Sequence, residues 1–162
     1  MSDPVRIAPV RTSVTVDVSR EHAFSVFTQR FGAWWPPSHH ISEVPLAEVR
    51  VEPRAGGRWY EVGTDGTECD WGSVLTWDPP ARLVLGWQLD ATFRFNPDFV
   101  TEVEVTFTAD GPNRTQVVLE HRNLERYGER GEEIRRTIGG DEGWPMILAS
   151  FAGLTTGQAT AV

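Results

Sequence analysis

The chain of 162 residues has no lysine, so all 15 of its basic residues are arginine. They stand against 23 acidic residues and leave a net charge of −8, and no segment gathers the arginines into a basic stripe. Nucleic acids and anionic membranes bind proteins through clustered positive charge, and a P-loop of the usual form contains a lysine. We therefore expect no nucleic-acid partner, no membrane partner and no P-loop.

Cysteine and long apolar runs are equally scarce. Cys69 is the only cysteine, so no disulfide can form within the chain. No run approaches the roughly 20 apolar residues that cross a bilayer, and the first ten residues lack the basic and then apolar segments of a secretory signal. These absences predict a cytoplasmic protein in a reducing compartment.

Aromatic residues, by contrast, are abundant, with 7 Trp and 8 Phe beside 2 Tyr. The length is that of one globular domain, and so much aromatic bulk indicates a large apolar interior that suits a ligand cavity. Residues 1–9 carry two prolines and no hydrophobic period. We therefore expect a flexible N-terminal arm over residues 1–9 and a single domain over residues 10–158.

Hydrophobic periodicity predicts an α+β fold. Apolar residues alternate with polar ones in segments that we expect to form antiparallel strands, at residues 10–18, 46–53, 58–62, 68–77, 82–89, 101–108 and 115–123. In the fourth of these, the alternation predicts one shared face for Trp71, Ser73, Leu75 and Trp77.

Two segments have the helical period instead. After the capping residue Ser19, phenylalanines at helical spacing predict a helix that Gly32 ends. A stripe near the C-terminus predicts a long last helix, and its members are Trp144, Ile147, Leu148, Phe151 and Leu154.

Three motifs, in chain order, resemble signatures of one known family. They are Gly-Gly-Arg-Trp at 56–59, Gly-Ser-Val-Leu at 72–75 followed by Pro-Ala-Arg-Leu at 80–83, and Gly-Trp-Pro at 143–145. In this order they resemble the family of the activator of Hsp90 ATPase, within the START/Bet v 1-like (SRPBCC) superfamily. The resemblance implies a helix-grip fold, in which a curved antiparallel sheet wraps around a long C-terminal helix, with two short N-terminal helices and a cavity between sheet and helix.

A denser set of motifs narrows the function that the resemblance implies. Trp-Trp-Pro at 34–36, Leu-Gly-Trp-Gln-Leu at 85–89 and Phe-Thr-Ala-Asp-Gly at 107–111 resemble the calicheamicin-type self-resistance proteins of enediyne producers. This implies a protein that binds a hydrophobic polycyclic or enediyne polyketide, in a pathway of the calicheamicin or dynemicin kind. Its role would be self-resistance, by sequestration or self-sacrifice, or biosynthesis.

Self-sacrifice in such proteins means that an activated enediyne removes a hydrogen atom from a glycine Cα, after which the backbone is cut. The resemblance places that glycine just after the Gly-Trp-x-Leu strand. This chain has Asp-Ala-Thr-Phe at 90–93, without glycine. Cleavage at this place is therefore not carried over to this chain.

The expected ligand-binding residues are the large aromatics of the predicted inner face and the few polar or apolar residues beside them. They are Trp34, Trp35, Trp59, Glu61, Trp71, Trp87, Phe93, Phe107, His121, Trp144, Ile147 and Phe151. Stacked rings favour a flat aromatic ligand beyond their simple burial of area.

Simpler interpretations stand beside these. Any single Trp fills a core well, Trp77 lies beside a proline turn, and Trp144 is part of the family signature. His121 has the parity of the buried face, so it is more simply a core histidine; in a functional role it would hydrogen-bond a ligand carbonyl or phenol. Cys69 lies between two acids that raise a thiol pKa, which disfavours a thiolate nucleophile but leaves a hydrogen-atom donor.

No cofactor and no metal are expected, because the other histidines lack partners at zinc-ligand spacing. We favour a binding or self-sacrificing protein over an enzyme and name no catalytic residue. The alternatives are a polyketide cyclase or aromatase, for which only Arg58, Glu61 and His121 offer polar groups, and an Hsp90 co-chaperone. The expected partner is a hydrophobic small molecule, and the expected assembly is a monomer or weak dimer.

Overall fold

The computed structural model describes residues 7–160, with side chains for residues 7–155. Its centre is a curved antiparallel sheet of seven strands in the order β1-β7-β6-β5-β4-β3-β2. The strands are β1 (Val10–Val16), β2 (Leu46–Val51), β3 (Arg58–Gly63), β4 (Glu68–Asp78), β5 (Arg82–Trp87), β6 (Thr101–Ala109) and β7 (Thr115–Arg122). Each strand after the second pairs with the strand before it, so most of the sheet is a meander.

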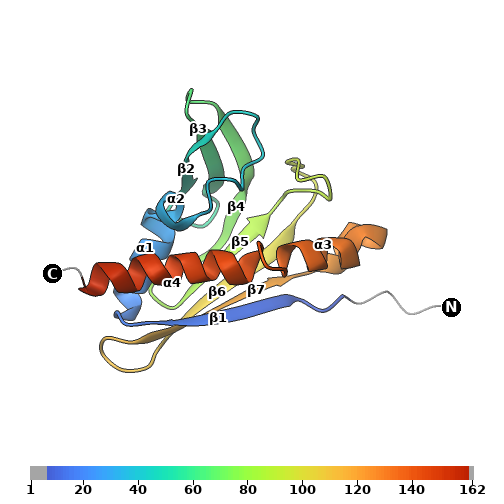
Figure 1. Cartoon of the computed structure of the whole chain (residues 1–162). Coiled ribbons are helices and arrows are strands. Elements are labelled where there is room, and N and C mark those ends of the chain that lie inside the picture. Colours follow the sequence, from blue (N-terminus) through green and yellow to red (C-terminus); the bar gives the residue numbers. More distant parts are fainter. Residues whose placement is uncertain (1–6, 161–162) are drawn as a thin grey trace.

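Helices cover one face of this sheet, which we call the inner face (Figure 1). They are α1 (Arg20–Gln29), α2 (Phe31–Trp34), the 3-10 helix η1 (Leu124–Arg130), α3 (Gly131–Ile138) and α4 (Trp144–Thr160). The long α4 runs in front of the sheet and packs beside β1. This arrangement confirms the predicted α+β helix-grip fold. No helix in the described part of the chain is long and apolar enough to cross a membrane.

The core forms where the strand alternation predicted it. On β6 and β7 the inward residues are at most 1% exposed, and they are Val103, Val105, Phe107, Val117, Leu119 and His121. α4 buries Trp144, Ile147, Leu148 and Phe151 against them, with Leu154 partly buried at the edge. Burial of these side chains supplies the main favourable term in folding.

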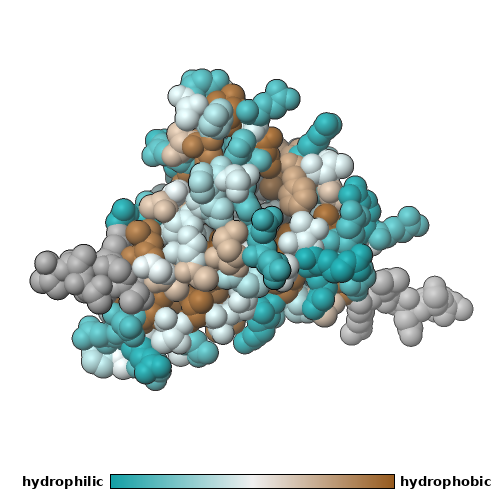
Figure 2. Space-filling view, viewed as in Figure 1, coloured by the Kyte–Doolittle hydropathy of each residue, from teal (hydrophilic) through white to brown (hydrophobic). Residues whose placement is uncertain are grey.

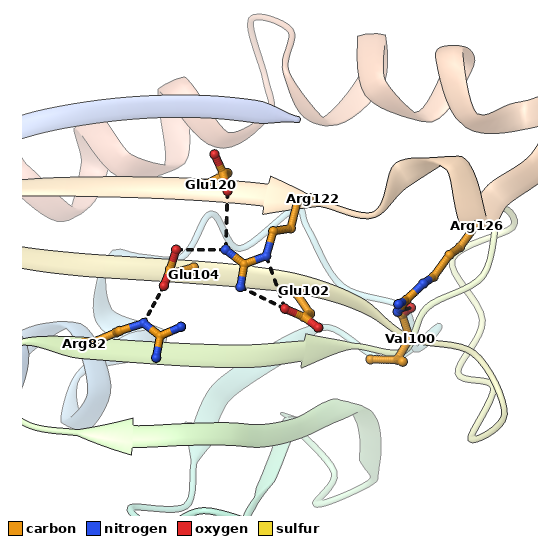
Figure 3. A network of polar contacts seen from close by, with 7 residues as sticks. All are labelled: Arg82, Val100, Glu102, Glu104, Glu120, Arg122 and Arg126. Carbon is orange, nitrogen blue, oxygen red and sulfur yellow. Dashed lines mark hydrogen bonds and ion pairs between the residues drawn. The ribbon is translucent and has the colours of Figure 1, made fainter. Parts of the chain in front are cut away.

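The outer face of the sheet carries charge, as Figure 3 shows. Arg122 on β7 donates to Glu102 and Glu104 on β6, both at 2.8 Å, and to Glu120 at 3.3 Å, while Arg82 on β5 binds the other side of Glu104. Burial alone would lower the pKa of Arg122, but the hydrogen bonds to Glu102 and Glu104 raise it above its ordinary value. Opposite charges therefore pair across three strands on this face of the sheet.

Three local predictions are wrong. Val74 is buried opposite Leu85, and Leu75, which the register shift between Val74 and Thr76 leaves without a partner on β5, is 43% exposed, so Leu75 does not share the face of Trp71. β5 ends at Trp87, although Leu89 still makes an isolated bridge to Phe95.

The third concerns the first helix, which ends at Gln29 and not at Gly32. Arg30 leaves the helical conformation, with φ −118° and ψ 31°, and the short α2 then includes Gly32. A Cβ at position 32 would lie 2.8 Å from the backbone nitrogen of Val49. Glycine is therefore needed here for the close approach of α2 to β2.

Residues 1–6 of the expected arm lie outside the described residues. Of the remainder, Ile7 is buried in the core cluster. The single domain over 10–158 stays a prediction.

Candidate functional site

A cavity of about 260 Å³ lies between the inner face of the sheet and the start of α4. Three connections frame it: residues 35–45, which we call the mouth loop, the β5–β6 connection, and the turn between α3 and α4. On the side of the molecule shown in Figure 2, hydrophobic residues surface in separate patches within a mainly hydrophilic exterior. The cavity lining is Trp35, His39, His40, Ile41, Trp71, Trp87, Leu89, Phe93, Thr137, Ile138, Glu142, Gly143, Trp144 and Ile147.

Four indoles from four elements form the aromatic wall. The ring centroid of Trp35 lies 4.9 Å from that of Trp71 and 5.8 Å from that of Trp144, and Trp87 lies 5.8 Å from Trp144. Interplanar angles of 50–71° make these contacts tilted or edge-on, a favoured geometry for aromatic pairs.

Three of these indoles donate their N–H groups to acceptors within the protein. Trp35 Nε1 donates to the carbonyl oxygen of His39 at 2.7 Å, and Trp71 Nε1 donates to Glu61 Oε1 at 2.8 Å. Trp144 Nε1 donates to His121 Nδ1 at 3.0 Å. The rings are thereby fixed in place, and what they offer a ligand is apolar and π surface rather than a donor.

Glu61 lies behind the wall as a fully buried acceptor. Besides Trp71 Nε1, its carboxylate accepts the backbone N–H of Ile41 at 2.7 Å and that of Ser42 at 3.3 Å. Its exposed fraction is 0%. Both oxygens accept, so the carboxylate satisfies three donors and fastens the mouth loop to β3.

His121 is the second buried polar residue behind the wall. Because Nδ1 accepts from Trp144, the ring proton is on Nε2, which donates to Thr101 Oγ1 at 2.7 Å. Burial lowers the pKa of His121 to about 3. The ring is neutral at physiological pH and holds the first turn of α4 on β7.

The mouth loop is also tied to the turn before α4. His39 Nε2 donates to the carbonyl oxygen of Glu142 at 2.7 Å, and its Nδ1 accepts from Ser38 Oγ at 3.0 Å. At the same turn, a Cβ on Gly143 would lie 2.0 Å from the carbonyl oxygen of Ile138. Only glycine permits this tight entry into α4, which sets the position of Trp144.

Phe93 stands at the opposite side of the mouth. It is 37% exposed and has φ +60°, a left-handed conformation that is uncommon for a residue with a bulky side chain. Asp90 stabilises this turn, since its Oδ1 accepts from the backbone N–H groups of Thr92 and Arg94 at 2.9 and 3.1 Å. The Thr92 hydroxyl also donates to this oxygen, at 2.6 Å, and this side-chain hydrogen bond, followed by the backbone contacts, lowers the pKa of Asp90.

The structure brings some of the predicted ligand residues to the cavity, namely Trp35, Trp71, Trp87, Phe93, Trp144 and Ile147. Glu61 and His121 lie behind its wall. Trp59 lies one layer deeper, 5.4 Å from Trp71 and 5.8 Å from Trp87. Trp34, Phe107 and Phe151 pack around Phe27 at the α1 side of the core, at 4.7, 5.8 and 5.2 Å, and do not line the cavity.

Several lining residues were not selected from the sequence. His39, His40 and Ile41 lie in a polar loop with no periodicity, and Thr137, Ile138 and Glu142 lie around a glycine break. His39 and Glu142 are 103 residues apart, so no local pattern links them. The adjacent His39 and His40 are the one feature of this loop that could have drawn attention to it, but they suggest only a zinc site, which their spacing disfavours. Within residues 7–160 no group of three His, Cys, Asp or Glu is arranged to hold a metal ion.

Two other residues considered for chemistry lie away from the cavity. Arg58 pairs with Asp70 and Glu68 and stacks over Tyr60, with its guanidinium 3.8 Å from the ring centroid. The pKa of the half-buried Cys69 is raised by burial first, and then by the charges of Glu61 and Asp70. The influence of Glu61 comes from across the strand pair, because Cys69 faces Glu61 in the register.

The chain matches a known protein family over most of its length. The model of the family described as Activator of Hsp90 ATPase homolog 1-like protein matches residues 17–156. No protein in the curated set matches the chain.

Solved structures give closer relatives. The chain is 42% identical to the anthrahydroquino-γ-pyrone synthase Txn09, with a TM-score of 0.65, over 92% of this chain and 97% of Txn09. It is 36% identical to CalC, a self-sacrificing resistance protein from Micromonospora echinospora, with a TM-score of 0.72, over 96% of this chain and 98% of CalC. DynU16, from the dynemicin biosynthetic locus, is 19% identical with a TM-score of 0.61, over 93% of this chain and 48% of DynU16, and shows the shared fold alone.

Proposed function

We propose that this chain, which belongs to the family of Activator of Hsp90 ATPase homolog 1-like proteins, binds a planar polycyclic polyketide of the enediyne or aromatic class. The observation that carries the proposal is the aromatic cavity at the start of α4, where Trp35, Trp71, Trp87 and Trp144 meet. Its volume of about 260 Å³ lies just below the roughly 300–1,000 Å³ of typical small-molecule sites. It suits one compact ring system.

The chemistry of the wall favours a neutral ligand. Three indole N–H groups are already bonded to protein acceptors, so most of the affinity would come from ring contacts and burial of apolar area. Glu61 lies behind the wall, Glu142 stands at the mouth, and the whole chain carries a charge of −8. These two carboxylates and the net negative charge would repel an anionic ligand.

The relatives support the same ligand class. One is by its name a synthase of an anthrahydroquino-γ-pyrone, and the other is a self-sacrificing resistance protein. We place this chain in enediyne resistance or polyketide biosynthesis on that basis. For resistance we favour sequestration over self-sacrifice, since residues 90–93 contain no glycine.

A ring-forming enzyme is the second candidate. The 42% identity to a synthase favours it, and so does the presence of the half-buried His40 in the lining. Turnover of more than one equivalent of ligand per protein would distinguish this role from sequestration. A co-chaperone role ranks third, because the cavity itself favours a small molecule. The cytoplasmic location and the monomer or weak dimer also stay predictions.

Filling the cavity should weaken ligand binding. Ile41 is a half-buried lining residue of the mouth loop, and a phenylalanine there places its larger ring in the ligand space. We expect Ile41→Phe to weaken binding of 2-hydroxyanthraquinone by at least about tenfold, equivalent to about 1.4 kcal/mol, in titrations that follow the absorbance of the probe.

The matched control is Leu75→Phe, an enlargement at an exposed residue of β4. This variant should bind within about twofold of the unmodified protein, because surface changes away from a site have small effects. Absence of saturable binding by the unmodified protein, or an equal loss in both variants, would contradict the proposed site.

A further inference from the structure

His40 differs from the other histidines at the cavity in how its ring is bonded. It lies in the mouth loop, is half-buried and lines the cavity. Its Nδ1 lies 2.6 Å from the carbonyl oxygen of Ser42. A ring nitrogen that bonds a carbonyl oxygen has to carry the proton, so Nδ1–H donates and Nε2 of the neutral ring holds a free lone pair.

The other two imidazoles near the cavity have no such lone pair to offer. In His39, Nε2–H donates to Glu142 and Nδ1 accepts from Ser38. In His121, Nδ1 accepts from Trp144 and Nε2–H donates to Thr101. For Nε2 of His40, no hydrogen-bond partner occurs among residues 7–155.

Of the other polar side chains of the lining, the Trp87 N–H is a donor buried without a partner among the described residues, and the rest are committed or turned to solvent. The hydroxyl of Thr137 donates to the carbonyl oxygen of Glu133 within α3, and the Glu142 side chain is exposed. Three of the four indole N–H groups are donors already in use. An apolar, aromatic space therefore has one imidazole acceptor that is free to meet a ligand.

We propose that Nε2 of His40 accepts a hydrogen bond from a hydroxyl group of the bound polycycle. The site then selects phenolic ligands over the same ring systems with an alkylated oxygen, because an ether has no proton to donate. This inference rests on the proposed function and names the ligand class more closely: a neutral, phenol-bearing polycyclic compound. In the same contact, Nε2 lies within hydrogen-bond distance of the hydroxyl proton, which is the first geometric requirement for a general base that removes this proton.

The test compares two probes that differ in one group, 2-hydroxyanthraquinone and 2-methoxyanthraquinone. The hydroxyl at this ring position is not engaged by the quinone carbonyls, so its proton is available to the protein. We expect the unmodified protein to bind the hydroxyl probe about fivefold more tightly, the usual scale of one net hydrogen bond. In His40→Phe the two affinities should agree within about twofold.

Two further variants separate recognition from structure. His40→Gln keeps a side-chain acceptor and should retain part of the preference, whereas His22→Phe, on the exposed face of α1, should retain all of it. Equal binding of both probes by the unmodified protein, or an undiminished preference in His40→Phe, overturns the role of His40 and leaves the cavity as the binding site. Failure of both probes to bind overturns the proposed function and this inference together.

Discussion

Replacing Glu61 with alanine should lower the free energy of unfolding by about 4 kcal/mol. The carboxylate accepts from Ile41 N and Ser42 N of the mouth loop and from Trp71 Nε1 of β4. Removing it leaves these donors without a partner in a fully buried place, at about 1–3 kcal/mol for each donor that water cannot reach. Urea unfolding followed by Trp fluorescence measures the change.

Two variants show whether the acceptor role is the cause. Glu61→Gln keeps one acceptor oxygen but presents N–H groups to the remaining donor, so we expect a loss of about 2 kcal/mol. Glu68→Ala, on the neighbouring strand and 45% exposed in its pair with Arg58, should cost less than about 1 kcal/mol. Equal losses for Glu61→Ala and Glu68→Ala would contradict the role assigned to Glu61.

The Glu61 variant should also loosen the cavity. Hydrogen exchange at the amides of Ile41 and Ser42 should accelerate, because these groups lose their acceptor. The amide of Val105, on the central strand β6, reports the global stability and serves as reference. Unchanged exchange at Ile41 relative to Val105 would mean that the loop is held by other contacts.

The second large effect is a pH dependence that arises from His121. Burial lowers its pKa in the folded protein to about 3, whereas in the unfolded chain it titrates near its ordinary value of about 6.5. Above about pH 6.5 the ring is neutral in both states. Between the two pKa values only the unfolded chain binds the proton, so stability falls as the pH falls, at up to about 1.4 kcal/mol per pH unit.

This linkage predicts a contribution of about 2 kcal/mol to the stability lost between pH 7 and pH 5. The variant His121→Gln has no titrating ring and keeps a donor and an acceptor for Thr101 and Trp144. Its loss over the same range should be about 2 kcal/mol smaller than that of the unmodified protein. Parallel pH profiles, or NMR signals of a protonated His121 ring in the folded protein at pH 5, would contradict the buried neutral imidazole.

The strands could be predicted from the sequence because their burial follows a local period. The parity of Val103, Val105 and Phe107 on β6 needs no knowledge of the partner strand. Where a bulge interrupts the ladder the same rule fails, as at Leu75, because the register shift depends on pairing with β5. The break after Gln29 was missed because its cause is the contact between Gly32 and β2.

All four tryptophans of the aromatic wall could be predicted from the sequence, by their chemistry and, for Trp35, Trp87 and Trp144, by their motifs. The contacts at the polar edge of the cavity could not. Glu61 meets Ile41 twenty residues away, and His39 meets Glu142 across 103 residues. The free nitrogen of His40 depends on the orientation of a single carbonyl group, that of Ser42. Contacts of this kind arise only when the loops are brought together.

The most direct test of ligand binding in the cavity is an NMR titration of the indole N–H groups of the seven tryptophans with 2-hydroxyanthraquinone. Single Trp→Phe variants assign the signals. We expect the signals of Trp35, Trp71, Trp87 and Trp144 to shift saturably, while that of Trp77, which packs against Phe24 at 5.1 Å, stays in place. Shifts confined to Trp77 and Trp34, or no saturable shift, would contradict a ligand site in the cavity at the start of α4.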